Sequence, residues 1–457
     1  MSSDLRVIGG QELAARIRTR QVSAREVMAW HLERIAARNP ALNAIVAKLD
    51  DTQCLALADD ADRALTRGDA VGPLHGLPWA FKDLEDAVGF PNTSGSPIFK
   101  DRMPAQDSAL VALLRRAGAI PIGKTNVPEF GMGSHTYNRV YGTTRNPADT
   151  TKSAGGSSGG AGAALASGML ALADGSDLGG SLRNPANFNG IVSLRPTSGL
   201  APALTDATSL GFNVKGPMAR SVSDVAFLLS VMLGEQEPWS LERDMKGVRI
   251  AWCPDLGGLP LDRRVRAVLD SRRQTFVELG CIVEDACPDF TDADEIFLTI
   301  RRRRTFTNLG GLLAAHRGEM KPEAVEEIEQ GARVADADFL WALEKHKALL
   351  WRLQRFFIRH EFFVCAVNQV PPFDASLDWP HEIEGVAMEH YCAWMKSAYW
   401  VSTTLCPAAS VPAGRTPGGL PVGMQIVGRR GNDRGVLQLA YAVEQHGVRR
   451  PGLSGRR

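Results

Sequence analysis

Short apolar runs alternate with helical patterns along most of this chain, and that alternation restricts its fold more than any other feature. Apolar runs bounded by turn residues predict strands at 76–82, 119–123, 248–253, 406–414 and 420–428. The alternation favours a single α/β domain, since no internal repeat or low-complexity linker divides the chain. Helical patterns are found at residues 23–40, 51–67, 108–117, 161–173, 262–278, 289–365 and 434–444.

Two local features sharpen this expectation. Pro40 is expected to end the first long helix, because proline cannot continue the helical hydrogen bonding. Residues 138–160 are polar and rich in Gly, Ser, Thr, Asn and Pro, which predicts a loop. The run 161–173 that follows consists mainly of Ala, Leu and Gly, and we expect a buried helix there, packed tightly against its neighbours.

The balance of charge excludes several classes of partner. The 457 residues include 52 Lys and Arg and 51 Asp and Glu, a formal net charge of +1. A chain this close to neutrality has no global field that would attract nucleic acid, a membrane surface or an acidic substrate. The one basic run, Arg301–Arg304, would spread around all sides of a helix and is expected on the surface, solvated or ion-paired. No nucleic-acid or membrane partner is expected.

The cysteines and the N-terminal sequence indicate a reducing compartment. The seven cysteines lack metal-site spacing, and the closest pair, Cys281 and Cys287, is accompanied by no histidine cluster. We expect free, mostly buried thiols rather than a disulfide framework, and no metal. The N-terminal residues lack the apolar core of a signal peptide, and no run approaches the roughly 18 apolar residues of a membrane span. The expected location is the cytoplasm.

One segment matches the residue pattern of a nucleotide-binding motif but lacks the structural context that the motif requires. Gly118–Thr125, GAIPIGKT, fits the P-loop expression GxxxxGK[ST]. A P-loop follows a strand and presents backbone N–H groups to phosphates. Here a helix is expected before the segment, and AIPI is strand-like and contains a proline without an N–H. A non-enzymatic nucleotide-binding module is therefore the weaker alternative.

Two serine–glycine clusters and one lysine carry the candidate chemistry. GGSSGG spans Gly155–Gly160, DLGGS spans Asp177–Ser181, and Lys82 ends the run GLPWAFK. Glycines beside a serine let a substrate approach the backbone, whose N–H groups can then stabilise an oxyanion. Each motif alone also fits a loop or a surface strand, whereas the combination indicates a serine hydrolase with a lysine base. GGSSGG also satisfies GxSxG, but polar residues precede it instead of the strand that an α/β-hydrolase elbow requires.

These motifs closely resemble those of the amidase signature family of serine hydrolases. The resemblance implies one domain over residues 1–457, with a large twisted mixed β-sheet, helices on both of its faces, and neither a metal nor an organic cofactor. It places N-terminal helices at 1–70, a signature core at 71–230 and a helical substrate-entrance region at 285–400. The segments that carry it are GLPWAFKD, GKTNVPEF, GTTRNP, KSAGGSSGGAGAALASG, SDLGGSLRNPANFNGIVSLRPTSG, CPAASVPAG and GLPVGMQIVG.

The resemblance also implies a Ser-cisSer-Lys triad. Ser181 would be the nucleophile, Ser157 the bridging serine after a cis Gly156–Ser157 bond, and Lys82 the base. Lysine normally titrates near 10.4, so burial must lower its pKa to about 7–8 for it to accept a proton at neutral pH. The oxyanion hole would consist of the N–H groups of Leu178, Gly179, Gly180 and Ser181.

Further roles follow from the same resemblance. Supporting roles are implied for Ser158, Asp177 and Arg183, and substrate contacts for Gly131 and Met132. His135 is expected to be a hydrogen-bonded structural residue. The chain departs from the family pattern at Ser176 and Leu178, where threonines are common, and at Arg195, where lysine is common.

The predicted function is hydrolysis of a carboxylic amide to an acid and an amine or ammonia. Two enzymatic alternatives remain open: carbamate (urethane), anilide or ester hydrolysis by the same triad, and the A-type glutaminase component of a glutamyl-tRNA amidotransferase. The small-molecule substrate is the expected partner, and a homodimer is compatible with the family. An apolar or aromatic substrate is indicated by aromatic residues of the helical region, namely Phe297, Phe306, Trp341, Trp351, Phe356 and Phe357.

Overall fold

A mixed eight-stranded β-sheet forms the centre of the molecule. The computed structural model describes residues 8–206, 209–235 and 237–447. The strand order is β4-β6-β5-β12-β13-β9-β7-β8, antiparallel from β4 to β9 and parallel from β9 to β8. The strands are β4 (Leu172–Asp177), β5 (Val192–Arg195), β6 (Val214–Ala219), β7 (Arg249–Trp252), β8 (Ile282–Asp285), β9 (Phe362–Ala366), β12 (Ala408–Arg415) and β13 (Pro421–Gly428).

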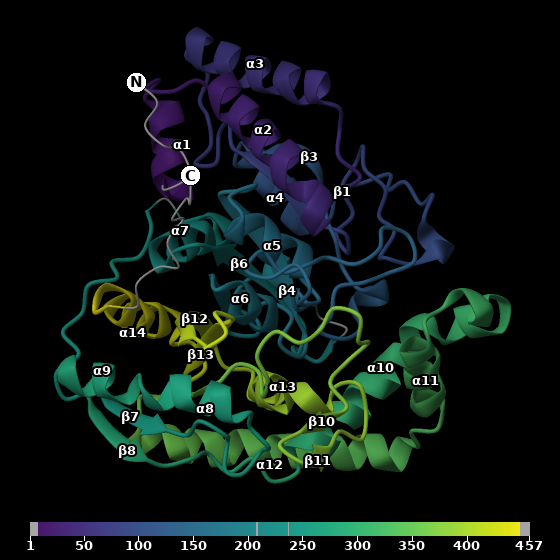
Figure 1. Cartoon of the computed structure of the whole chain (residues 1–457), viewed down its shortest axis with the longest axis vertical. Coiled ribbons are helices and arrows are strands. Elements are labelled where there is room, and N and C mark those ends of the chain that lie inside the picture. The colour runs from purple at the N-terminus through teal and green to yellow at the C-terminus, as the bar shows by residue number, and fades with distance from the viewer. Residues whose placement is uncertain (1–7, 207–208, 236, 448–457) are drawn as a thin grey trace.

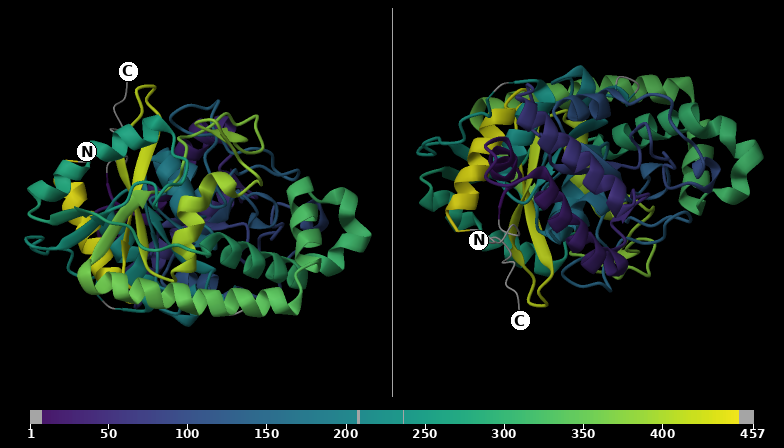
Figure 2. Two further views of the ribbon diagram at one scale, coloured as in Figure 1. Left: turned by 90° about the horizontal axis from the view of Figure 1, so that it is seen from below. Right: turned by 90° about the horizontal axis from the view of Figure 1, so that it is seen from above.

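Helices cover both faces of this sheet (Figure 2), as the sequence predicts. Side chains alternate between the faces along a strand. In β9, Phe362 and Val364 join one hydrophobic core, whereas Phe363 and Cys365 join the other. The first core includes residues of α7 (Val222–Leu233), α8 (Arg263–Asp270) and α14 (Asp433–Gln445). The second includes residues of α10 (Ala293–His316), α12 (Asp336–Arg359) and α13 (Lys396–Thr403).

The N-terminal helices lie beside a second, smaller sheet. This sheet has the order β1-β3-β2, with β1 (Ile45–Val46) antiparallel and β2 (Pro78–Lys82) parallel to β3 (Ile120–Thr125). A capping box begins α2, where Ser23 and Glu26 bond reciprocally. The N-terminal helices are α1 (Gly10–Arg18), α2 (Ala24–Leu42) and α3 (Asp51–Arg67), and α4 (Ala109–Arg116) precedes β3.

The helix expected to stop at Pro40 continues to Leu42. Because Pro40 stands in the last turn, its missing N–H removes only one helical hydrogen bond. Asn43, with a left-handed φ of 50°, then ends the helix. The Asn39 side chain accepts the N–H groups of Ala44 and Ile45, which stabilises the exit of the chain.

The predicted helix at 161–173 is wrong at both ends. The helix α5 spans Gly159–Ala166, ends at the left-handed Gly168 (φ 76°), and is followed by β4 from Leu172. The apolar run Leu-Ala-Leu therefore begins a buried strand, which periodicity alone cannot distinguish from a helix. The predicted helix at 262–278 is likewise two helices, α8 and α9 (Arg273–Glu278). The segment between β4 and β5 forms α6 (Arg183–Asn189).

The helical region after residue 289 projects beyond the sheet as an arm of α10, α11 (Pro322–Ala332) and α12 (Figure 1). The pattern at 289–365 thus contains three helices and then β9, which begins at Phe362 and was missed because apolar residues continue across the junction. A small hairpin of β10 (Glu382–Ile383) and β11 (Val386–Ala387) follows. In the described part of the chain, no helix is both long and apolar enough to cross a membrane.

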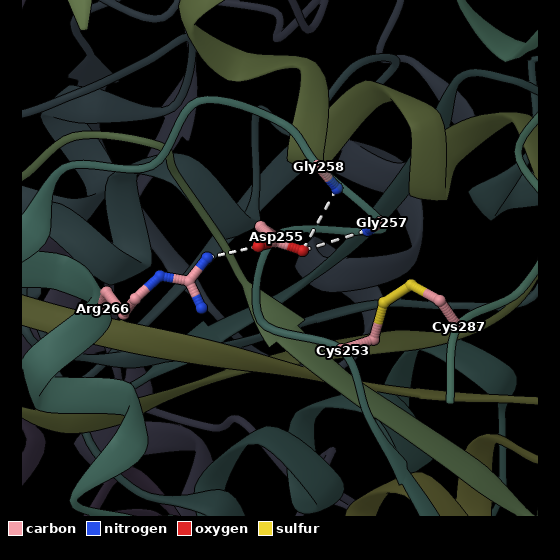
Figure 3. Close-up of a disulfide and its surroundings, with 6 residues drawn as sticks. All are labelled: Cys253, Asp255, Gly257, Gly258, Arg266 and Cys287. Atoms are coloured by element: carbon pink, nitrogen blue, oxygen red, sulfur yellow. Dashed lines mark hydrogen bonds and ion pairs between the residues drawn. A yellow bond between two sulfur atoms is a disulfide. The ribbon is translucent and has the colours of Figure 1, made fainter. Parts of the chain in front are cut away.

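Two of the seven cysteines are paired, contrary to the expectation of free thiols. A disulfide joins Cys253, just after β7, to Cys287, just after β8 (Figure 3). The two parallel strands end side by side, which brings the Cα atoms to 5.3 Å although 34 residues separate the cysteines in sequence. The nearby Asp255 accepts N–H groups from Gly257 and Gly258 and pairs with Arg266. The free cysteines are Cys54, Cys281, Cys365, Cys392 and Cys406, all buried.

The close packing of α5 gives a first testable prediction. A Cβ on Gly160 would collide with the backbone of Asn126 and lie 2.6 Å from the carbonyl oxygen of Ala44. We therefore expect Gly160→Ala to lower the free energy of unfolding by about 1–3 kcal/mol. Around Gly311, in exposed α10, no atom lies within 4 Å of the position that a Cβ would occupy, so Gly311→Ala should raise stability by about 0.5–1 kcal/mol. Urea titration of both variants measures this, and equal effects would contradict the packing argument.

Candidate active site

The lysine at the end of β2 is surrounded by hydroxyl groups. Lys82 is 1% exposed. Its Nζ lies 2.9 Å from Ser157 Oγ, 2.8 Å from Ser158 Oγ and 2.9 Å from Ser176 Oγ. Lys82 is the last residue of β2, and its side chain reaches two serines of the GGSSGG segment. The structure therefore brings together the lysine and the first serine cluster, which are 75 residues apart in sequence.

Burial controls the charge of this lysine. Removal from water lowers the pKa of Lys82 to about 7, although the carboxylates of Asp174, Asp177 and Glu85 act in the opposite direction. Asp174 Oδ2 accepts the backbone N–H of Lys82 at 3.2 Å rather than its ammonium. A neutral amine is therefore available near neutral pH, within hydrogen-bond distance of three hydroxyl groups.

The segment Gly155–Ser158 leads directly into α5. The Gly156–Ser157 peptide bond is cis, as the family resemblance implies. Ser157 is 2% exposed and Ser158 is fully buried. The N–H of Ser158 donates to the carbonyl oxygen of Ser181 at 3.2 Å, so the two serine clusters are joined by a backbone hydrogen bond.

The second cluster forms the turn between β4 and α6. Gly180 has a φ of 116°, a conformation that favours glycine, and its N–H donates to Asp177 Oδ1 at 2.8 Å. The Gly180 N–H therefore already has an acceptor in the protein, whereas the family resemblance implies that it donates to the oxyanion. Among the described residues, the N–H groups of Leu178, Gly179 and Ser181 have no protein acceptor.

A buried ion-pair cluster holds this turn from below. Arg183 contacts both carboxylate oxygens of Asp177, at 2.9 and 3.0 Å, and Arg195 contacts Oδ1 at 3.0 Å. All three side chains are fully buried. Burial alone would raise the pKa of Asp177, but the two guanidinium groups more than offset this and hold it well below its usual range. Asp177 and Arg183 thus hold the turn in place through buried contacts.

The two clusters open onto one cavity of about 510 Å³. Ser157, Ser176, Leu178 and Ser181 form its floor. Gly131 and Met132 line it as well, and a Cβ on Gly131 would lie 3.6 Å from Ser157 Oγ. The remaining described lining residues are Leu84, Glu85, Phe130, Thr205, Asp206, Asn213, Lys215, Arg301, Arg304 and Thr305, with no histidine among them.

The outer wall of the cavity is charged. Lys215 pairs with Glu85 at 2.7 Å, and Arg304 pairs with Asp206 at 2.6 Å. Arg301 is buried and lies 3.5 Å from Glu327, which corrects the expectation that the run Arg301–Arg304 lies wholly on the surface. The error arose because α11 covers the face of α10 that carries Arg301, and the sequence of α10 alone does not reveal that neighbour.

The aromatic residues that suggested an apolar substrate pack elsewhere. Phe297 is buried against Tyr399, at a ring distance of 4.4 Å, and its ring lies against Gly179. Phe356 and Phe357 pack against the second core. Phe306, Trp341 and Trp351 are exposed. Of the described aromatic residues, only Phe130 lines the cavity.

Comparisons with known proteins agree with this geometry. A family model named Amidase matches residues 26–437. The acylamidase of Rhodococcus erythropolis is 33% identical over 459 residues, covering 96% of each chain. The A-type component of the glutamyl-tRNA(Gln) amidotransferase of Synechococcus sp. strain CC9605 is 33% identical over 470 residues, covering 93% of each chain. A bacterial aryl acylamidase of the amidase signature family has a TM-score of 0.88 at 25% identity, covering 96% of each chain.

This chain belongs to the amidase signature family. It is therefore a hydrolase of amides built on the single-domain α/β fold of that family.

Two polar residues of this amidase site were not predicted as participants. Asp174 accepts Trp79 Nε1 at 2.8 Å as well as the Lys82 N–H, and Ser176 Oγ is a third hydroxyl partner of Lys82. Both lie in β4, two residues apart, so they share the face that points toward β2. If residues 172–177 (LADGSD) are taken as a strand, the alternation of side chains between its two faces places Asp174 and Ser176 on the same face.

Two other predictions are confirmed. Residues 120–125 of the P-loop-like motif form β3, and Lys124 is buried with its Nζ 2.5 Å from the carbonyl oxygen of Glu85. His135 lies 2.7 Å from Ser153 Oγ, and burial lowers its pKa to about 4. His135 is therefore a neutral structural residue in this amidase.

The ion-pair cluster beneath the turn yields a stability prediction. Asp177→Asn would leave two buried arginines without their carboxylate, and we expect a loss of about 3–5 kcal/mol in the free energy of unfolding. The control is Asp59→Asn, which breaks a partly exposed pair with Arg25 and should cost about 0–1 kcal/mol. Chemical denaturation of both variants tests the difference, and similar losses would show that the cluster is not essential.

Proposed function

We propose that Ser181 is the nucleophile of this amidase, that Ser157 relays protons, and that Lys82 is the base. The observation that carries the proposal is the contact of 2.9 Å between Lys82 Nζ and Ser157 Oγ, together with the cavity that both Ser157 and Ser181 line. Because the pKa of Lys82 is lowered to about 7, its amine can accept a proton near neutral pH.

Acylation begins with the attack of Ser181 Oγ on the substrate carbonyl carbon. The Ser181 proton passes to Ser157 Oγ, whose own proton passes to the Lys82 amine. When the tetrahedral intermediate collapses, the C–N bond breaks and the leaving nitrogen receives a proton from Lys82 through Ser157. Because Ser157 and Ser181 line one cavity and Ser157 Oγ contacts Lys82 Nζ, much of the entropic cost of assembling these groups is removed before the reaction.

The charge on the carbonyl oxygen is stabilised by the turn between β4 and α6. The N–H groups of Leu178, Gly179 and Ser181 are the donors that we assign to the oxyanion, because the N–H of Gly180 is held by Asp177. In this role Gly180 supports the turn rather than the oxyanion directly. Water then attacks the acyl-enzyme along the same proton path in reverse, releasing the acid.

The substrate-entrance role that we assign to residues 285–400 rests on α10. This helix contributes Arg301, Arg304 and Thr305 to the cavity. Gly131 and Met132, which line the same cavity, are the proposed substrate contacts. The charged wall suits a substrate with a polar group near the amide better than a wholly aromatic one. Anilides, carbamates and esters remain compatible, since they differ from simple amides only in the leaving group or the acyl heteroatom.

Glutamine hydrolysis is the second candidate, because two observations favour it. The charged wall could hold the polar end of glutamine, and the chain is 33% identical to the A-type component of an amidotransferase. Release of ammonia from glutamine, with little action on anilides, would select this alternative. Preference for anilides or aryl carbamates would select an acylamidase or urethanase.

Loss of activity in triad variants is the central prediction. We expect Ser181→Ala and Lys82→Ala each to lower kcat/KM by about 10³-fold or more on the preferred member of a panel. The panel contains acetamide, benzamide, a nitroanilide, a nitrophenyl ester, an aryl carbamate and glutamine. Circular dichroism confirms that the variants fold. Activity that survives Ser181→Ala would remove Ser181 from the nucleophile role.

The lowered pKa of Lys82 predicts the acid limb of the pH profile. Only the neutral amine accepts a proton, so kcat/KM should rise with pH through about 7 and fall about tenfold per unit below it. Steady-state rates between pH 5 and 9 measure this limb. The residual activity of Lys82→Ala should lack it, and a flat wild-type profile would contradict a titrating lysine base.

A further inference from the structure

A further buried lysine, Lys321, contacts a residue of the cavity wall but has no part in the proposed reaction. Lys321 is the residue before α11 and is 6% exposed. Its ammonium lies 5.5 Å from the ring centre of Tyr137 and 5.9 Å from that of Tyr391. Burying an ammonium costs free energy unless the group is paired or hydrogen-bonded. The partners of Lys321 therefore indicate its structural role.

The partners of Lys321 are the two ends of one short segment. Its Nζ donates to the carbonyl oxygen of Met132 at 2.6 Å, and its backbone N–H donates to Glu129 Oε2 at 2.7 Å. The other carboxylate oxygen of Glu129 accepts from Ser96 Oγ at 2.7 Å. Residues 129–132 are called the acyl loop below. Lys321 therefore forms hydrogen bonds with both the first and the last residue of the acyl loop.

The acyl loop forms part of the wall of the catalytic cavity. Phe130, Gly131 and Met132 all line that cavity. A second cavity of about 390 Å³ is lined by Glu129 and Lys321. Met132 and Phe130 also pack in a small hydrophobic cluster with Met320, Ala324 and Ile328, so the acyl loop lies against the start of α11.

The backbone of the acyl loop needs external support. Phe130 has a φ of 53°, which is unfavourable for a residue with a side chain, and Gly131 follows with a φ of 69°. Only one turn of 3-10 helix is present, with the N–H of Met132 bonded to the carbonyl of Glu129 at 3.0 Å. Such a conformation persists only where surrounding contacts determine it. The two hydrogen bonds from Lys321 are such contacts.

We propose that Lys321 is a positioning residue that fixes the acyl loop, and with it the part of the cavity wall formed by Phe130, Gly131 and Met132, by anchoring it to the start of α11. The inference rests on the proposed function in so far as the acyl loop contacts substrate. Lys321 touches neither Ser181 nor Lys82 in the described structure, so it acts through Met132. Selectivity for the acyl group then depends on a side chain outside the catalytic cavity.

The test compares Lys321→Met with a matched control. Lys321→Met keeps the length and the apolar stem but removes the ammonium. The control, Arg139→Met, removes another cation from the same connection, where Arg139 donates to the carbonyls of Gly318 at 3.1 Å and Met320 at 3.2 Å. No hydrogen bond joins Arg139 to the acyl loop among the described residues. A general loosening of α11 would affect both variants alike.

Hydrogen exchange reports directly on the acyl loop, whatever the substrate. In Lys321→Met, the N–H groups of Gly131 and Met132 should exchange at least about tenfold faster than in the wild type, because their backbone hydrogen bonds open more often. Arg139→Met should leave them unchanged, and Lys321→Arg should restore most of the protection. Wild-type exchange in Lys321→Met, or the same rise in Arg139→Met, would overturn the inference.

Kinetics provide a second readout that a merely structural lysine would not affect selectively. For anilides with acetyl and benzoyl groups, Lys321→Met should raise KM for the benzoyl substrate at least about tenfold more than for the acetyl substrate, with kcat changed less. Equal KM changes for both would overturn the inference. Failure of the proposed function has a different signature: activity would survive Ser181→Ala, or the wild type would hydrolyse no member of the substrate panel, while the exchange experiment would still decide the role of Lys321.

Discussion

The exclusion of water around Lys82 is the constraint on which the rest of the site depends. A lysine in water would carry a proton at neutral pH and could not act as a base. Here three serine hydroxyl groups replace water around the amine, and the nearest acidic neighbour, Asp174, is engaged with Trp79 and with the Lys82 backbone N–H. The hydroxyl groups satisfy the amine without restoring its charge, whereas a carboxylate in the same place would hold the proton.

This arrangement requires backbone segments to approach unusually closely. A Cβ on Gly160 would meet the backbone of Asn126 and Ala44, and one on Gly159 would meet the Thr136 side chain. The small residues of α5 therefore let the serine segment lie against β2 and β3. Beneath the neighbouring turn, Asp177 with its two arginines fixes the second serine cluster, and the Ser158–Ser181 hydrogen bond ties the clusters to each other. Tight packing and the buried ion pairs thus both fix the relative positions of the two serine clusters.

The sequence predicted the parts of the site that are encoded locally. Glycine–serine patterns mark Ser157 and Ser181, and an apolar run ending in lysine marks Lys82. It did not predict Ser176 and Asp174, because the boundary between α5 and β4 was misplaced and their common strand face was lost. Arg301, the Cys253–Cys287 pair and Lys321 depend on neighbours far away in the chain. Such contacts follow from the topology of the sheet and of the helical arm, which periodicity within one segment cannot supply.

The insertion of the helical arm between two strands has a consequence for how such enzymes diversify. The proposed reacting groups lie within residues 82–181, whereas α10 and α11 enter the chain between β8 and β9. The sheet order places β7 between these two strands, and the arm leaves and rejoins the sheet without interrupting the segments that hold the proposed triad. Mutations in the arm can therefore reshape what enters the cavity while the apparatus for bond breaking is inherited unchanged. The range of substrates can therefore change by mutation of the arm while the catalytic groups, in the same domain, stay the same.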